Sequence, residues 1–156
     1  MNVTDRSALQ LIRSFARIEY ALKSFTEFTR GAPGDVPDAQ WTAFYVSVRD
    51  NVEAGVRPAT RDVLLGNHPN NAPPMKMDIG PDGRVRFKDQ PLLGPIGDRL
   101  MDAARRVRNN LVHGGKELAS QQRYDGHDQR LVEAATDVIF VAAAAHPDVA
   151  LLFFID

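Results

Sequence analysis

The N-terminal part of the chain carries two apolar stripes at helical spacing. The first predicts a core-facing helix over about residues 5–29, with Thr4 or Asp5 as its N-terminal cap and Gly31 just past its end. It consists of Leu11, Phe15, Ile18, Leu22 and Phe25. The second stripe lies on roughly the opposite face and consists of Leu9, Ile12, Ala16 and Tyr20. A helix with two apolar faces is either central in a bundle or shared between a core and a partner chain.

Further helical segments follow along the chain. The pattern predicts helices over about 39–52, 95–111 and 127–145, and at best a short helix over 57–66. Asp38 is expected to cap the first of these, and Pro95 and Gly114 mark the two ends of the next long one. The apolar tail, 149–155, is expected to form a short helix or a strand packed on the other helices.

The spacing of apolar and polar residues changes between about residues 67 and 95. Two short alternating segments, 75–79 and 84–88, flank a Pro-Asp-Gly turn and predict a β-hairpin. This insertion has too few apolar residues for a core of its own. We therefore expect an all-α protein, a single domain over residues 1–156, built as an antiparallel four- to five-helix bundle with a small β-hairpin insertion between helices.

Composition narrows the classes of function. The chain has 156 residues and no cysteine, which excludes a disulfide framework, a thiolate zinc site and a cysteine nucleophile. Its 19 Lys and Arg against 20 Asp and Glu give a net charge of −1, which argues against a protein that coats nucleic acid or a membrane surface. The first residues lack the basic and then apolar pattern of a secretory leader, so none is expected, and the most apolar run, 138–145, is too short to span a bilayer. We expect a cytoplasmic protein without membrane contact.

One segment departs from this neutral average. Residues 99–116 hold five Lys or Arg and one acid, and they include His113. Arginine binds phosphate bidentately, and histidine transfers protons near neutral pH. Arg108 and His113 lie five positions apart, which places them about 140° apart on a continuous helix. They serve one substrate only if the helix ends at Gly114-Gly115 and frees the imidazole, or if two chains pair. Basic residues in a last turn also have a purely structural explanation, because they oppose the helix dipole.

The same segment, Arg108-Asn109-Asn110-Leu111-Val112-His113-Gly114, resembles the signature of the HEPN superfamily (higher eukaryotes and prokaryotes nucleotide-binding domains). That signature is an Arg, a polar residue, three further residues and a His at the end of a helix. Residues 15–23 are similar to the opening helix of such domains, in which a basic residue follows an acidic one four positions later, here Glu19 and Lys23. This pair is equally explained as an ordinary surface ion pair. The insertion lies outside the resemblance.

The resemblance implies a homodimer whose two motifs face each other, and metal-independent cleavage of RNA without a cofactor, often by a toxin or an antiviral effector. The products would be a 2′,3′-cyclic phosphate and a 5′-OH. His113 would act as general base or acid, Arg108 would stabilise charge on the phosphoryl oxygens, and Asn109 would orient the reacting groups. The expected substrate-binding residues are Arg105, Asn110 and Lys116, and the expected supporting pair is Glu19 and Lys23.

Two other functions fit the same sequence. A non-catalytic dimer would use the motif to bind RNA, a nucleotide or a partner protein such as an antitoxin. A purely structural protein would use the basic turn only as a helix end. The intact Arg, Asn and His favour the enzyme, whereas the net acidity favours weaker contact with RNA. The other histidines, His68, His127 and His146, lack metal-ligand spacing, so no metal site is expected.

Overall fold

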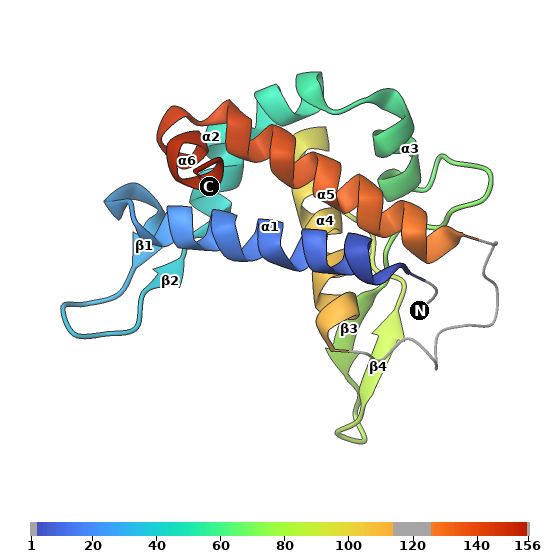
Figure 1. Cartoon of the computed structure of the whole chain (residues 1–156). Coiled ribbons are helices and arrows are strands. Elements are labelled where there is room, and N and C mark those ends of the chain that lie inside the picture. The colour runs from blue at the N-terminus through green and yellow to red at the C-terminus, as the bar shows by residue number, and fades with distance from the viewer. Residues whose placement is uncertain (1–2, 114–125, 156) are drawn as a thin grey trace.

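The computed structural model describes residues 3–113 and 126–155 and shows a mainly helical protein (Figure 1). The helices are α1 (Asp5–Lys23), α2 (Trp41–Gly55), α3 (Pro58–Leu65), α4 (Ile96–Val112), α5 (His127–Ala145) and α6 (Pro147–Phe153), with a 3₁₀ turn η1 (Thr26–Phe28). Strand β1 (Thr29–Arg30) pairs with β2 (Asp38–Ala39), and β3 (Lys76–Ile79) pairs with β4 (Val85–Lys88), both antiparallel. The predicted helical fold with a small β insertion is confirmed.

Helix α5 lies at the centre of the packing. It contacts α1, α2, α3, α4 and α6. Small side chains on its buried face let these neighbours approach closely: Ala134, Ala135, Ala142 and Ala143. In Figure 1, α1 and α5 lie side by side and both run from right to left, while α4 crosses behind them. The antiparallel bundle expected from the sequence is not confirmed.

The two stripes of α1 have separate environments. Leu11, Phe15, Ile18 and Leu22 are buried in the core, as predicted. Leu9, Ile12 and Tyr20, by contrast, are exposed. The core therefore uses one face of α1 and leaves the second apolar stripe on the surface.

Helix α1 ends earlier than the sequence pattern predicted. It stops at Lys23, and a 3₁₀ turn and a short strand replace the last predicted turns. The Thr29 hydroxyl donates to the carbonyl oxygens of Leu22 (3.1 Å) and Phe25 (2.8 Å). A side chain thus satisfies acceptors at the helix end that a further helical turn would have used. The predicted end at Thr29 was wrong for this reason.

Helix α2 begins at Trp41 because Asp38 and Ala39 pair with the strand Thr29–Arg30. Asp38 does not cap this helix as predicted, since its carboxylate accepts a hydrogen bond from Arg30 at 2.6 Å. The other predicted helices agree more closely with the structure. Helices α3 and α5 are confirmed, α4 ends one residue beyond its predicted end, and the apolar tail is the helix α6.

Helices α2 and α4 cross at closest approach beside Gly97. A Cβ atom at this position would lie 2.2 Å from the carbonyl oxygen of Arg49 in α2. The same crossing carries an ion pair between Arg49 and Asp98 at 3.2 Å. Only glycine fits here, and the contact fixes α4 along and around α2.

The β-hairpin insertion is tied to α4 by two buried polar side chains. The Arg106 guanidinium donates to the carbonyl oxygens of Gln90 (2.6 Å) and Pro91 (3.5 Å), on the chain that leaves the hairpin. The Asn110 amide donates to the carbonyl oxygen of Met75, just before β3, at 3.0 Å. Both ends of the hairpin are therefore held against the C-terminal half of α4.

We predict that Gly97→Ala destabilises the fold by about 1–3 kcal/mol, because the added methyl group meets a backbone carbonyl that cannot rotate away. Urea unfolding measures the effect. Gly55→Ala is the matched control, because its Cβ would meet only the Val141 methyl group at 2.9 Å. Equal losses in the two variants would contradict the close crossing.

Candidate functional site

The C-terminal half of α4 carries the residues that the sequence singled out. Its apolar stripe faces the core and consists of Leu100, Ala103, Ala104 and Val107. The polar residues between these positions point in three directions: toward α1, toward α2 and toward the insertion. Each arginine of the basic segment therefore meets a different environment.

Arg108 packs against α1. Its guanidinium carbon lies 5.1 Å from the centre of the Phe15 ring, within the range of a cation–π interaction. Its Nε is buried and has no hydrogen-bond partner among the described residues. Burial lowers the pKa of the Arg108 guanidinium, while attraction to the Glu19 carboxylate opposes this shift. The phenyl ring and the carboxylate hold a positive charge at the surface next to α4.

Glu19 and Lys23 form the ion pair that their spacing predicts. The Lys23 ammonium lies 3.2 Å from a Glu19 carboxylate oxygen, and both side chains are about one-third exposed. Such a pair contributes a few tenths of a kcal/mol. Glu19 also favours the charged form of Arg108. The structure therefore brings Arg108 and the predicted supporting pair to the same place.

Arg105 faces α2. Its guanidinium carbon lies 5.1 Å from the centre of the Trp41 ring, and its Nη1 donates to the Tyr45 hydroxyl at 3.4 Å. Burial raises the pKa of the Tyr45 phenol to about 12, although the neighbouring Arg105 opposes this rise. The phenol therefore stays neutral over the physiological range and accepts a hydrogen bond from a fixed arginine.

Arg106 and Asn110 serve the fold. Arg106 is 8% exposed; besides its bonds to the insertion, it pairs with Asp102 at 2.9 Å. Asn110 is 5% exposed and bonds to Met75. Its Oδ1 is buried without a hydrogen-bond partner in the described structure. The contacts of Asn110, one of the expected substrate-binding residues, are those of a side chain that anchors the hairpin.

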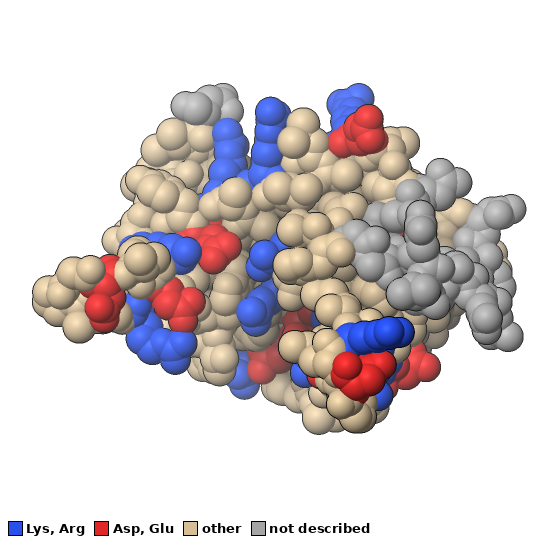
Figure 2. Space-filling model, turned by 90° about the horizontal axis from the view of Figure 1, so that it is seen from below, with Lys and Arg blue, Asp and Glu red and all other residues tan. Residues whose placement is uncertain are grey.

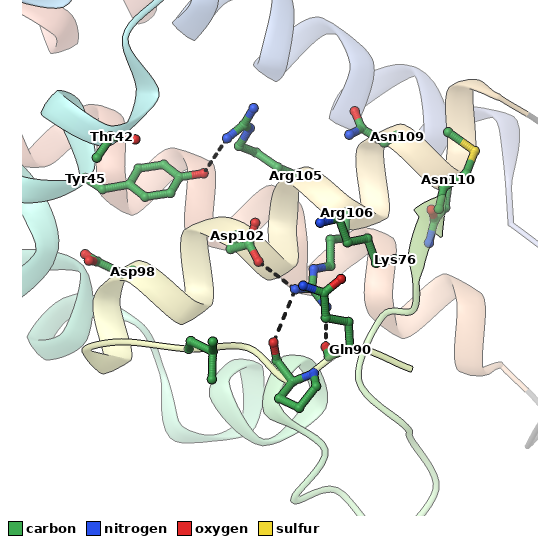
Figure 3. Close-up of a pocket in the computed structure, with 13 residues that line it drawn as sticks. Thr42, Tyr45, Lys76, Gln90, Asp98, Asp102, Arg105, Arg106, Asn109 and Asn110 are labelled. Carbon is green, nitrogen blue, oxygen red and sulfur yellow. Dashed lines mark hydrogen bonds and ion pairs between the residues drawn. The ribbon is translucent and has the colours of Figure 1, made fainter. Parts of the chain in front are cut away.

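A groove of about 580 Å³ lies between α2, α4 and the insertion. Figure 3 shows Asp102, Arg105 and Asn109 projecting along it from α4, with Tyr45 and Gln90 on the facing walls. Thr42, Lys76, Asp98, Arg106 and Asn110 complete its polar lining. The groove offers both donors and carboxylate acceptors, so it is chemically mixed rather than uniformly basic.

His113 lies directly after the last residue of α4. It is exposed, and its backbone N–H donates to the carbonyl oxygen of Asn109 at 3.0 Å. His113 follows Asn109 by four positions, but it is not among the described residues that line the groove. Arg108 does not line the groove and lies on the α1 side. Lys116, the remaining predicted residue, lies outside the described residues.

Sequence reasoning missed several residues around these side chains. Trp41 and Tyr45 are buried and also hold Arg105. Asp98 and Asp102 line the groove beside the basic residues. The spacing of Asp102 and Arg106, four positions apart on one helix, was the available signal for their ion pair. No local pattern indicated that Arg105 lies near residues from α2.

The charge on this side of the molecule is mixed. Figure 2 shows Lys and Arg side chains across the middle of the face, between the β1–β2 loop and the β3–β4 hairpin, with Asp and Glu side chains close to them. The face is therefore neither uniformly basic nor uniformly acidic. In the part of the chain that the structure describes, no helix is long and apolar enough to cross a membrane.

A second polar group lies at the start of α6. Glu27, His146 and Asp148 place one potential ligand atom each within 4.8 Å of one another. His146 also packs edge-on against Phe28, with ring centres 5.1 Å apart, and its Nε2 lies 3.4 Å from Glu27. His146 thus contacts both Phe28 and Glu27, and none of the three residues lines the groove.

The chain was compared with family models, curated proteins and solved structures, and none of them matches it.

We predict that Asn110→Ala lowers the free energy of unfolding by about 1–3 kcal/mol, because it leaves the Met75 carbonyl oxygen without its donor. Asn109→Ala, the matched control on the neighbouring position, should change stability by less than about 0.5 kcal/mol. Urea unfolding of the two variants measures this. Equal stabilities would contradict the anchoring role of Asn110.

A second prediction concerns Tyr45. The pKa of its phenol is raised from 10 to about 12 in the fold. Between these two values the unfolded chain loses the phenol proton and the folded protein keeps it, so the free energy of unfolding falls as the pH rises from 10 to 12. The full contribution to stability is present below pH 10. Two pKa units correspond to about 3 kcal/mol. Urea unfolding between pH 9 and 12 should show a steeper loss for the unmodified protein than for Tyr45→Phe, which lacks the titrating group. Parallel curves would contradict the assignment.

Proposed function

We propose that the chain is a metal-independent endoribonuclease of HEPN type, a helical bundle whose site lies at the C-terminal end of α4. One observation carries the proposal. Arg108 is held as a charged group by Phe15 and Glu19, and His113 lies exposed just past Val112, where the helix ends. An oriented guanidinium and an accessible imidazole are the two groups that phosphodiester cleavage without a metal needs.

The reaction balances with these groups. The ribose 2′-oxygen attacks the adjacent phosphorus, its proton passes to a base, and the bond from phosphorus to the 5′-oxygen breaks as that oxygen takes up a proton. The products are a 2′,3′-cyclic phosphate and a 5′-OH. His113 acts as the base or the acid, Arg108 stabilises the negative charge that develops on the phosphoryl oxygens, and Asn109 orients the reacting groups.

The groove provides a path for the RNA strand. Arg105 lies on its edge and, three positions before Arg108, forms a positive row with it along α4. Asn109 lines the groove, and His113 caps the helix four positions later, with its backbone N–H bonded to Asn109. A strand lying across the last turns of α4 would meet arginine on one side and the imidazole on the other.

Pairing of two chains completes the site. Arg108 and His113 of one chain point about 140° apart around α4, so one phosphate does not easily reach both. In a homodimer the Arg108 of one chain and the His113 of its partner line one groove. This arrangement uses each residue in the orientation that α4 gives it.

The test is incubation of the purified protein with a mixed RNA pool in EDTA. We expect cleavage with cyclic-phosphate ends, recognised because phosphatase removes the phosphate only after acid opening. His113→Ala should lower the rate by about 10²–10⁴-fold through loss of proton transfer. Arg108→Ala should lower it by about 10²–10³-fold through loss of charge stabilisation. His68→Ala, a histidine in the insertion, is the matched control and should cleave normally.

Two further outcomes are decisive. Mixing His113→Ala with Arg108→Ala chains should restore part of the activity, because a mixed dimer contains one complete shared site; no recovery would assign the site to a single chain. RNA that is bound but not cut, or cutting that neither substitution affects, would contradict the enzyme. Binding without cleavage would favour the non-catalytic dimer.

A further inference from the structure

The outer face of α1 is apolar although it faces solvent. Leu9, Ile12 and Tyr20 are 48%, 40% and 66% exposed, and Ala16 between them is also exposed. These residues follow one another at intervals of three, four and four. That spacing forms a continuous seam of the kind by which two helices pack, and the small Ala16 at its centre allows close approach. The core does not use this seam, because α1 already buries its opposite face.

Three arginines run along one edge of the seam. Arg6, Arg13 and Arg17 are all exposed, and none forms an ion pair with a residue that the structure describes. Arg17 donates to the carbonyl oxygen of Phe153 at 3.4 Å, which aligns it beside α6. This edge of α1 therefore carries three positive charges that are not neutralised within the described structure.

A groove of about 400 Å³ continues the surface from α1 toward α5. Leu9 and Phe140 supply apolar walls, and Arg6, Arg13 and Arg17 form its basic rim. Phe140 in turn packs on Phe153 and Phe154, with ring centres 5.3 and 5.9 Å away. Phe154 is 48% exposed. The apolar seam and the aromatic cluster of Phe140, Phe153 and Phe154 thus form one surface, and the arginines lie between them.

We propose that this surface, formed by the outer face of α1 and its groove toward Phe140, binds an acidic amphipathic helix of a partner protein. The apolar side of that helix covers Leu9, Ile12, Ala16 and Tyr20. Its carboxylates pair with Arg6, Arg13 and Arg17, whose intervals of seven and four match positions on one side of a helix. The surface from Arg6 to Tyr20 is about 21 Å long, so a partner helix of about four turns would cover it.

The observations favour this occupant over three others. Three of the four seam residues are aliphatic, so the seam offers no run of aromatic rings on which successive nucleic-acid bases could stack. A flat bilayer does not fill a groove between two helices. In a two-fold antiparallel pair of α1 helices from two copies, the arginine edges would face each other, and like charges repel. The arginine edge of the seam is turned away from Glu19, and neither Arg108 nor His113 lines the groove, so this proposal does not depend on RNA cleavage.

The test uses the full chain and a designed helical peptide of about 16 residues, with Leu at seam positions and Glu beside them. Fluorescence anisotropy should show binding of this peptide and none of a matched peptide with Lys in place of Glu. Arg13→Glu should weaken binding about tenfold or more. Arg84→Glu, the same charge change on an exposed hairpin residue, should leave it unchanged. Arg6→Glu/Arg13→Glu should instead bind the Lys peptide.

Several results would overturn the proposal. Failure to bind the Glu peptide, or equal binding of both peptides, would remove the role of charge. Self-association that Leu9→Ser/Tyr20→Ser abolishes, seen by light scattering, would assign the surface to a second copy. Binding of polyuridine or of phosphatidylserine–phosphatidylcholine vesicles that Arg13→Glu abolishes, with no binding of the Glu peptide, would assign it to RNA or to a membrane.

Discussion

The close crossing of α4 over α2 at Gly97 decides where the polar side chains of the candidate site lie. A carbonyl oxygen of α2 occupies the space of a missing side chain, so α4 has little freedom to slide or rotate. With α4 held there, Arg105 meets Trp41 and Tyr45, Arg108 meets Phe15, and Arg106 points to the insertion. One backbone contact near the start of the helix therefore sets the surroundings of three arginines further along it.

Arg105, Arg106 and Arg108 are close in sequence and carry the same charge, but their contacts differ. Arg106 is buried and satisfies two carbonyl oxygens, which compensates the cost of removing its charge from water. Arg105 and Arg108 each place one face of the guanidinium on an aromatic ring and keep donors near the surface. A guanidinium of that kind is already oriented before an anion arrives, so less side-chain entropy is lost on binding.

Helix α1 connects two surfaces of the molecule. On one side Phe15 and Glu19 support the charge of Arg108, and on the other side Arg6, Arg13 and Arg17 border an exposed apolar seam. A partner bound to the seam would lie against the same helix that positions Arg108.

The sequence by itself determined the helices, the hairpin and the double-sided character of α1, because these follow from the local period of apolar residues and from turn chemistry. It also singled out Arg108, Asn109 and His113, which lie within six consecutive positions, but it did not show that Arg108 faces α1 while Asn109 lines the groove. The early end of α1 and the β1–β2 pair depend on Thr29 reaching back to α1 and on Asp38 meeting Arg30, and neither contact has a local signature. Only the tertiary structure decided which arginine anchors the insertion and which arginines lie beside an aromatic ring. The reason is that burial and partners come from α1, α2 and residues 75–91, far along the chain from α4.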